Sequence, residues 1–122
     1  ELFSGENINI FVGDVFDLNS EQVGPVNAVY DRAALVALPK EMRRRYTAHL
    51  LNMTSRSSQL LVTFEYDQEL MPGPPFAIPA DEVEEHYGKT HEPTRLESRH
   101  VEGGLKGLGA ALESIWLLAQ RS

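Results

Sequence analysis

Apolar residues in this 122-residue chain are grouped in short runs separated by turn residues. Runs rich in β-branched and aromatic residues predict strands. Three such runs occupy residues 8–12, 26–30 and 59–66. In the last run, Leu60, Leu61 and Val62 do not alternate with polar residues. This pattern is typical of a strand that is covered on both faces, and it makes 59–66 the strongest predicted strand.

A helical period begins after Pro39 and predicts a helix over residues 40–51. Proline is well tolerated in a first helical turn, which supports this start. The apolar side chains that share one face of the helix are Met42, Tyr46, Leu50 and Met53. The basic run at 43–45 lies off that face, and we expect it to be solvated.

Prolines interrupt the chain at residues 71–79, where the missing amide donors exclude a helix or an interior strand. Asp81 is expected to cap a short helix over residues 82–87 that ends at Gly88.

Two extended segments, 92–101 and 114–119, close the chain and are joined by a glycine-rich connector at 103–109. The earlier alternation of strands and helices predicts a parallel sheet with crossover helices. The final pair is expected to be antiparallel at the edge of that sheet. The fold class is therefore α/β, with its ligand crevice at the carboxyl ends of the parallel strands.

The composition of the chain excludes several kinds of partner and several classes of protein. The net charge of -7 argues against nucleic acid and against an anionic membrane surface as partners. The chain has no cysteine, which excludes a disulfide scaffold, a metal site with thiolate ligands and a cysteine nucleophile. No apolar run approaches the ~20 residues of a membrane helix, and the first residues do not form a signal peptide. We therefore expect a cytoplasmic protein.

Ligands bind at the carboxyl ends of parallel strands, and polar residues follow all three predicted strands. These residues are Asp14 after the first strand, Asp31 and Arg32 after the second, and Tyr66 and Asp67 after the third. Groups at strand ends can specify a ligand without disturbing the core. A second interpretation stays open, because Asp14 and Asp31 could only cap the following turn or helix. Asp31 and Arg32 could also pair with surface neighbours.

The proline segment at 72–75 has two interpretations as well. It is either a stiff connector or an apolar lid over a planar ligand, with Phe76 as the stacking group. No metal site is predicted, because the four histidines show no ligand spacing. The glycines at 103–109 lack the strand and the Gly-Lys ending of a phosphate loop, and no serine lies in a nucleophile elbow.

Several stretches together resemble the thiopurine S-methyltransferase family, in its bacterial branch. The most specific are Tyr-Asp-Arg-Ala-Ala at 30–34 and Pro-Gly-Pro-Pro-Phe at 72–76. Gly-Asp-Val-Phe-Asp-Leu at 13–18 and the closing run at 113–118 fit the same family, in the same order.

The resemblance implies a class I (Rossmann-like) S-adenosylmethionine-dependent methyltransferase fold, whose sheet ends in an antiparallel strand pair. Residues 1–122 would be the C-terminal part of a single methyltransferase domain, without its first two strands. The implied reaction is methyl transfer to the sulfur of thiopurines and aromatic thiols, and in bacterial members also to selenium and tellurium species, which connects the family with tellurite resistance.

The same resemblance implies roles for particular residues. Asp14 and Val15 would lie beside the adenine of S-adenosylmethionine, and Arg32 would lie at the junction of cofactor and acceptor. Pro74 and Phe76 would belong to the cover of a small-molecule thiol acceptor. No catalytic acid or base and no metal is expected.

The chain departs from the family in two respects. The glycine-rich cofactor loop is absent, so we expect a missing N-terminal half or a self-associated copy to complete the sheet. A family arginine before the last strand has no clear match, since Glu102 falls near it and Arg99 is the closest basic residue. The alternative function is a non-catalytic remnant, or an interaction module that pairs through exposed strand edges. An unrelated nucleotide-binding domain is disfavoured, because no phosphate loop is present.

Overall fold

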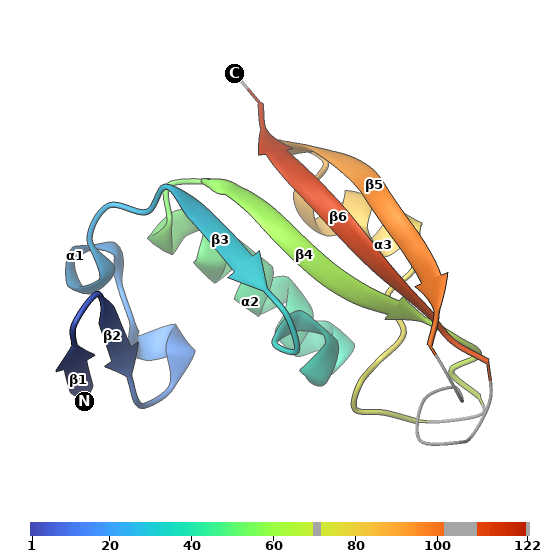
Figure 1. The fold of residues 1–122 in the computed structure, drawn as a ribbon, viewed down its shortest axis with the longest axis horizontal. Helices are drawn as coiled ribbons and strands as arrows, with labels where there is room; N and C mark the ends of the chain where they lie inside the picture. Colours follow the sequence, from blue (N-terminus) through green and yellow to red (C-terminus); the bar gives the residue numbers. More distant parts are fainter. Residues whose placement is uncertain (70–71, 102–109, 122) are drawn as a thin grey trace.

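The computed structural model describes residues 1–69, 72–101 and 110–121, in which strands and helices alternate along most of the chain (Figure 1). The strands are β1 (Leu2–Gly5), β2 (Ile8–Phe11), β3 (Ala28–Asp31), β4 (Ser58–Glu65), β5 (His91–His100) and β6 (Leu112–Gln120). The helices are α1 (Ser20–Val23), α2 (Lys40–Met53) and α3 (Ala80–Tyr87), with the 3-10 helices η1 (Val15–Asp17) and η2 (Leu35–Ala37). The glycine connector at 103–109 lies outside the described residues. No helix in the described part is long and apolar enough to cross a membrane.

The main sheet has four strands in the order β3-β4-β6-β5. β3 and β4 are parallel, and α2 forms the connection between them. β6 is antiparallel to both β4 and β5. The predicted parallel pair with a crossover helix and the predicted antiparallel pair are therefore confirmed. Pro93 lies in β5, where an edge strand tolerates a missing amide donor.

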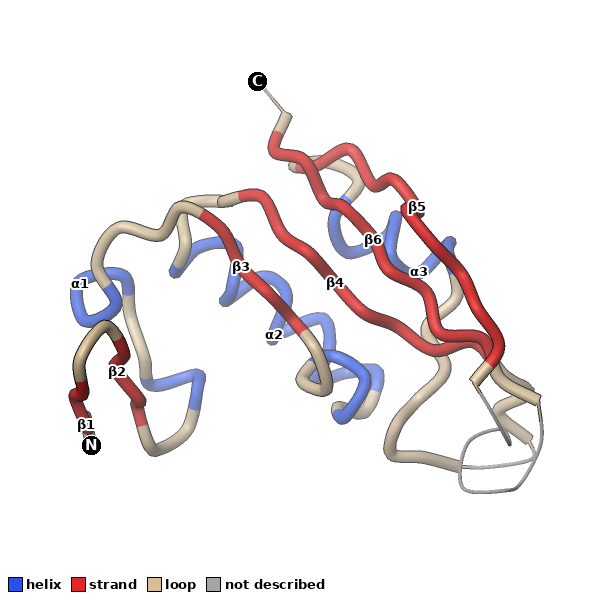
Figure 2. Tube along the Cα trace, in the orientation of Figure 1, coloured by secondary structure: helices blue, strands red, loops and turns tan. Residues whose placement is uncertain are grey.

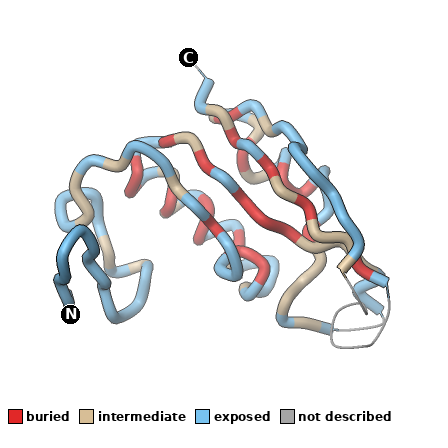
Figure 3. Tube along the Cα trace, viewed as in Figure 1, coloured by how far each residue is buried: buried red, intermediate tan, exposed pale blue. Residues whose placement is uncertain are grey.

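Both α2 and α3 lie on the same face of this sheet (Figures 1 and 2). Side chains from that face form the core, and Figure 3 shows the buried residues along β4, β6 and α2. The core residues are Leu35, Val36, Tyr46, Leu50, Met53, Leu61, Ile78, Val83, Tyr87, Trp116 and Leu118. Burial of this apolar set is the main stabilising contribution to the fold.

The opposite face of the sheet carries no helix in the described part of the chain. Tyr30, Leu60 and Leu117 are register neighbours across β3, β4 and β6. Their exposed fractions are 61%, 37% and 38%. The prediction that the strand at 59–66 is covered on both faces is therefore wrong for Leu60. Successive side chains alternate between faces, so Leu61 reaches the helices and Leu60 does not.

The strand predicted at 8–12 is present as β2, but its place in the fold differs from the prediction. β2 pairs with β1 in an antiparallel hairpin, and these two strands form a sheet of their own. A two-residue loop, Glu6 and Asn7, joins them, and Asn7 adopts a left-handed φ of 62°. Such a short loop closes at little entropic cost, which makes the hairpin a local structure. The expected group of three neighbouring parallel strands is therefore reduced to β3 and β4 in the described residues.

Two helix starts test the capping predictions. Pro39 is the N-cap of α2, which confirms the predicted start. α3 begins at Ala80, two residues earlier than predicted, with Pro79 at its N-cap. The prediction that Asp81 caps this helix is wrong, because Asp81 lies inside the first turn and no side chain makes a capping bond. Its charge still favours the positive end of the helix dipole, and Gly88 ends the helix as predicted.

Candidate functional site

Asp31 is the last residue of β3, and its side chain is buried beneath the turn that follows. Its Oδ1 accepts a hydrogen bond from the amide of Leu35 at 3.3 Å, and its Oδ2 accepts one from the hydroxyl of Tyr46 at 2.9 Å. The interpretation of Asp31 as a residue that holds the next turn is therefore confirmed. Burial, together with the charge and hydrogen bond of Asp31, raises the pKa of Tyr46 well above its ordinary value.

Arg32 follows directly and is exposed at the carboxyl end of β3. Its side chain has no hydrogen-bond or ion-pair partner among the described residues. The next residue, Ala33, adopts a left-handed φ of 73°, which costs free energy for a residue with a Cβ atom. The turn thus directs a permanent positive charge into solvent at the strand end, where the fold class predicts a ligand.

The proline loop, residues 72–79, is attached to two neighbouring strand ends. On one side, the amide of Phe76 donates to the carbonyl of Val36 at 2.6 Å. On the other side, the amide of Ile78 donates to the carbonyl of Phe64 at 2.8 Å, and the Tyr66 hydroxyl donates to the carbonyl of Pro75. The loop therefore joins the segment after β3 to the end of β4, as a cover over the parallel strand ends requires.

The ring of Phe76 is half-buried and held from two directions. A Cβ atom added at Gly73 would lie 2.7 Å from Cδ1 of this ring, so the ring packs directly on the Gly73 backbone. Gly73 also has a φ of 95°, which only glycine adopts readily. The guanidinium carbon of Arg43 lies 5.5 Å from the ring centroid. This distance is within the range of a cation–π contact.

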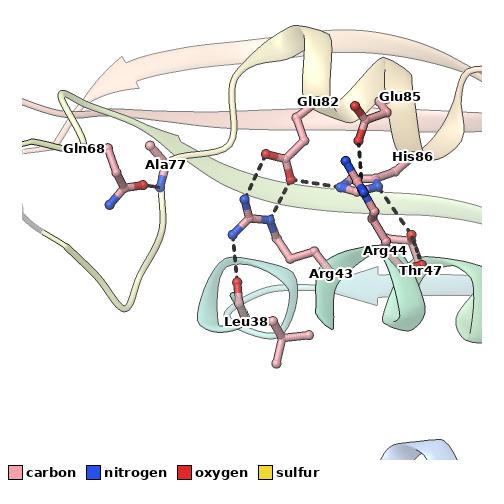
Figure 4. Close-up of polar contacts among 9 residues, drawn as sticks. All are labelled: Leu38, Arg43, Arg44, Thr47, Gln68, Ala77, Glu82, Glu85 and His86. Carbon is pink, nitrogen blue, oxygen red and sulfur yellow. Dashed lines mark hydrogen bonds and ion pairs between the residues drawn. The ribbon is translucent and has the colours of Figure 1, made fainter. Parts of the chain in front are cut away.

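The prediction that all three arginines at 43–45 are solvated is wrong for Arg43, although Arg44 and Arg45 are exposed. Arg43 is only 5% exposed, and its guanidinium is hydrogen-bonded in its plane (Figure 4). Nε and Nη2 donate to Glu82 of α3 at 2.6 and 3.0 Å, and Nη1 donates to the carbonyl of Leu38 at 2.8 Å. A buried charge is tolerated when it is paired in this way.

The sequence contained a signal for this burial. Arg43, Tyr46, Thr47 and Leu50 are spaced three and four residues apart, and all four are buried. The predicted buried face of this helix included Met42, and Arg43 lies outside a face defined in that way. The spacing of these four residues is enough to predict the buried face of α2. It does not predict that Glu82, on another helix, binds Arg43.

Glu82 is the centre of this polar cluster. Its Oε2 also lies 2.9 Å from Nε2 of His86, whose Nδ1 is 3.5 Å from the hydroxyl of Thr47 (Figure 4). Burial by itself would raise the pKa of Glu82, but the hydrogen bonds and charges of Arg43 and His86 outweigh it and hold the pKa below 4.5. Glu82 is thus ionised at neutral pH and compensates the buried guanidinium.

Asp14 and Val15 belong to a different part of the surface. Asp14 is the N-cap of η1, because its Oδ1 accepts a hydrogen bond from the amide of Phe16 at 2.9 Å. The predicted capping bond of Asp14 is therefore present, and its role beside a cofactor stays a prediction. Its Oδ2 has no hydrogen-bond partner among the described residues. A cleft of about 300 Å³ is lined by Glu1, Phe11, Val12, Gly13, Asp14, Val15, Asp17, Leu18 and Gln22.

This cleft contains neither Arg32 nor the proline-loop residues Pro74 and Phe76. The structure thus attaches the proline loop to Val36 of η2, the segment after the turn that carries Arg32, and it describes Asp14 and Val15 in a separate hollow. The convergence of all five residues on one ligand stays a prediction. Across the described ranges, no group of three or more His, Cys, Asp or Glu side chains is placed to hold a metal ion.

A four-stranded mixed sheet with helices on one face defines a mixed α/β protein (Figure 1). A family model described as "Thiopurine S-methyltransferase (TPMT)" matches residues 1–120. The chain belongs to the thiopurine S-methyltransferase family. Membership implies the class I methyltransferase fold, and the family uses S-adenosylmethionine.

Individual relatives agree with the family model. The thiopurine S-methyltransferase of Teredinibacter turnerae is 51% identical over 120 residues, which are 98% of this chain and 56% of that protein. The one from Xanthobacter autotrophicus is 51% identical over 116 residues, which are 95% of this chain and 54% of that protein. The one from Acinetobacter baylyi is 37% identical over 114 residues, with 93% and 52% covered. The chain spans about half the length of the curated relatives it matches.

Proposed function

We propose that the full-length protein transfers a methyl group from S-adenosylmethionine to the sulfur of thiopurines and other aromatic thiols. The observation that carries this proposal is the hydrogen bond between the Phe76 amide and the Val36 carbonyl. It attaches an apolar cover to the segment after the turn that bears Arg32. An apolar cover beside an unpaired cation suits a flat, aromatic and anionic acceptor. Selenium and tellurium species, the further acceptors implied by the resemblance, belong to the same proposal.

The chemistry needs alignment more than acid–base catalysis. S-adenosylmethionine supplies an electrophilic methyl group when it is bound, and a thiolate is already the nucleophile. Pro74 and Phe76 would exclude water from the acceptor, and Arg32 would stabilise the anion or hold an acidic group of the acceptor. The free Oδ2 of Asp14 could accept a hydrogen bond from an exocyclic amine, and Val15, 37% exposed, offers apolar contact. These two residues thus fit the adenine part of the cofactor.

The test is an Arg32→Ala variant of the full-length protein, assayed with an aromatic thiol and S-adenosylmethionine. Loss of a charge-assisted contact predicts a fall in kcat/KM of about 10- to 100-fold. The melting temperature should change little, because Arg32 is exposed. The control is Arg44→Ala, which removes an exposed arginine from α2 and should leave the activity unchanged. A parallel loss of activity and stability would reduce Arg32 to a structural role.

A second candidate is a non-catalytic module that pairs through strand edges. The observation in its favour is the free edge of β3, which pairs with β4 on one side and has no other strand beside it in the described sheet. Calorimetric titration of the 122-residue chain with S-adenosylhomocysteine separates the candidates for this polypeptide. A measurable heat of binding would show that the 122-residue chain binds the cofactor product by itself. No heat at millimolar S-adenosylhomocysteine would support the non-catalytic module.

We also propose that the rest of the full-length protein is the partner that covers the open sheet face. Its support is the apolar row of Tyr30, Leu60 and Leu117, together with relatives that are nearly twice as long as the matched region. In the full-length protein, Leu60→Lys would then bury a charge and lower the melting temperature by about 5 °C or more. Leu96→Lys, at a 56% exposed position of β5, is the matched control. Equal small effects would show that the face stays open, and a dimer in solution would assign it to a second copy.

A further inference from the structure

Arg43 connects the candidate acceptor loop to the body of the fold. Its Nε and Nη2 donate to Glu82, its Nη1 donates to the carbonyl of Leu38, and its guanidinium carbon lies 5.5 Å from the ring centroid of Phe76. One buried side chain of α2 therefore contacts α3, the segment after η2 and the proline loop. No other role for Arg43 follows from the family match.

Stability alone does not require this arrangement. A buried ion pair is often no more stable than an apolar pair of similar volume, because both charges lose their hydration. A guanidinium has one property that an apolar side chain lacks, which is the ability to donate hydrogen bonds in its plane while an aromatic ring stacks on its face. The two carboxylate bonds of Glu82 fix that plane, and the plane in turn fixes the ring of Phe76.

The remaining contacts of Phe76 restrict the same ring. Its backbone amide is bonded to Val36, and its ring lies against Gly73, where a Cβ atom would be 2.7 Å from Cδ1 of the ring. The neighbouring amide of Ala77 donates to Oε1 of Gln68 at 3.0 Å (Figure 4). The loop is thus held along its backbone, and Arg43 is the polar group that sets the orientation of the aromatic side chain.

We propose that Arg43 is a positioning residue for the methyl acceptor, which it serves by holding the ring of Phe76 and the Leu38 carbonyl in place. The proposal rests on the proposed function, since it takes the proline loop as the acceptor cover. A cover that is ordered before binding loses less entropy when the acceptor arrives. Arg43 therefore affects binding of the acceptor and leaves binding of S-adenosylmethionine unchanged.

The experiment uses Arg43→Lys in the full-length protein, because lysine keeps the charge opposite Glu82 but lacks the planar fork. We expect the KM for an aromatic thiol to rise about 10-fold, as loss of a desolvated cation–π contact predicts. The KM for S-adenosylmethionine should stay within about twofold. Amide hydrogen exchange of Phe76 should become faster while the exchange of β4 and β6 is unchanged.

The matched control is Arg44→Lys, which makes the same change one position along α2. Arg44 is exposed, and its ion pairs with Glu41 and Glu85 are long, at 3.6 and 3.8 Å. We expect this variant to behave as the wild-type protein in both kinetics and exchange. A second variant, Phe76→Leu, should raise the thiol KM by itself, and adding Arg43→Lys to it should cause no further rise.

Three results would decide the matter. An unchanged thiol KM and unchanged exchange at Phe76 in Arg43→Lys would overturn the proposal, and so would an equal rise in both KM values with faster exchange throughout the sheet. If the wild-type protein methylates no thiol, while exchange at Phe76 still rises selectively in Arg43→Lys, the proposed function fails and Arg43 remains the residue that orders Phe76.

Discussion

The hydroxyl of Tyr46 donates a 2.9 Å hydrogen bond to Oδ2 of Asp31, and both residues are buried. This bond joins the middle of α2 to the last residue of β3. Since Oδ1 of the same carboxylate holds the amide of Leu35, the bond from Tyr46 also orients the turn that exposes Arg32. A core hydrogen bond therefore determines where a surface charge is presented.

Tyr46→Phe should lower the free energy of unfolding by about 1–3 kcal/mol, because it leaves a buried carboxylate oxygen without its partner. Urea denaturation of the full-length protein measures this loss. Glu41→Gln is the control, since Glu41 lies on the same helix, is 85% exposed and should change stability by less than about 0.5 kcal/mol. Equal effects of the two substitutions would show that the Asp31 carboxylate does not depend on Tyr46.

Glu82→Gln should remove an acid-dependent part of the stability. The pKa of Glu82 is held below 4.5 in the folded protein, so its contribution is complete above pH 4.5 and is lost as the pH falls through the lowered pKa. The wild-type protein should be more stable than the variant by about 3 kcal/mol at pH 7, because the variant leaves Arg43 unpaired. Urea midpoints from pH 7 to pH 3 should show this difference shrinking.

The exposed pair of Glu41 and Arg44 provides the control for that experiment. Glu41→Gln removes a carboxylate that is 85% exposed and 3.6 Å from its partner, and it should change stability little at any pH. A constant difference between wild type and Glu82→Gln over the whole pH range would contradict the lowered pKa.

Gly73→Ala should be more damaging than Gly24→Ala. Both glycines have positive φ, 95° and 78°, so alanine is strained at either position by about 1–3 kcal/mol. Only at Gly73 would the new Cβ atom meet a neighbour, the ring of Phe76 at 2.7 Å. We expect a further loss of at least about 1 kcal/mol there, measured by thermal unfolding. Similar losses would mean that the ring moves aside freely.

Ala33→Gly should stabilise the protein. Ala33 has a φ of 73°, and removing its Cβ relieves about 1–2 kcal/mol of backbone strain. The greater freedom of glycine in the unfolded chain offsets part of this gain, so the net increase should be up to about 1 kcal/mol. Differential scanning calorimetry would show a higher melting temperature. A lower one would mean that the methyl group of Ala33 makes a packing contact that exceeds the strain.

Local signals predicted most of the elements. The start of α2 at Pro39 and the buried positions Tyr46, Leu50 and Met53 follow from proline stereochemistry and helical spacing. The rule that ligands bind at the carboxyl ends of parallel strands also selected the turn at Asp31 and Arg32. In the parallel pairing of β3 with β4, Asp31 lies opposite Leu61, and β4 continues to Glu65. Asp14 and Asp31 each accept a hydrogen bond from a backbone amide in the segment that follows, as the capping interpretation predicts, and a ligand-binding role for Asp14 stays a prediction.

The errors at Arg43 and Leu60 concern contacts between distant residues, whereas the error at Asp81 concerns a helix boundary two residues away. Arg43 is buried because Glu82, 39 positions away, meets it on another helix, and no spacing within α2 contains that information. The strand that contains Leu60 is predicted to be covered on both faces. The connections of the chain place α2 and α3 on one face (Figure 1), so Leu60 on the other face is 37% exposed. Asp81 does not cap α3, since Pro79 already begins the helix.

By itself, the amino-acid sequence determined the family, the order of strands and helices, and the residues at the strand ends. These depend on backbone preferences and on periodicity over a few neighbouring positions. Only the tertiary structure decided that the proline loop is attached at Val36 and Phe64, and that Arg43 lies beneath Phe76 with its charge matched by Glu82. Burial of a charge is decided by the partner that the fold brings to it, and that partner lies on a separate element of the chain.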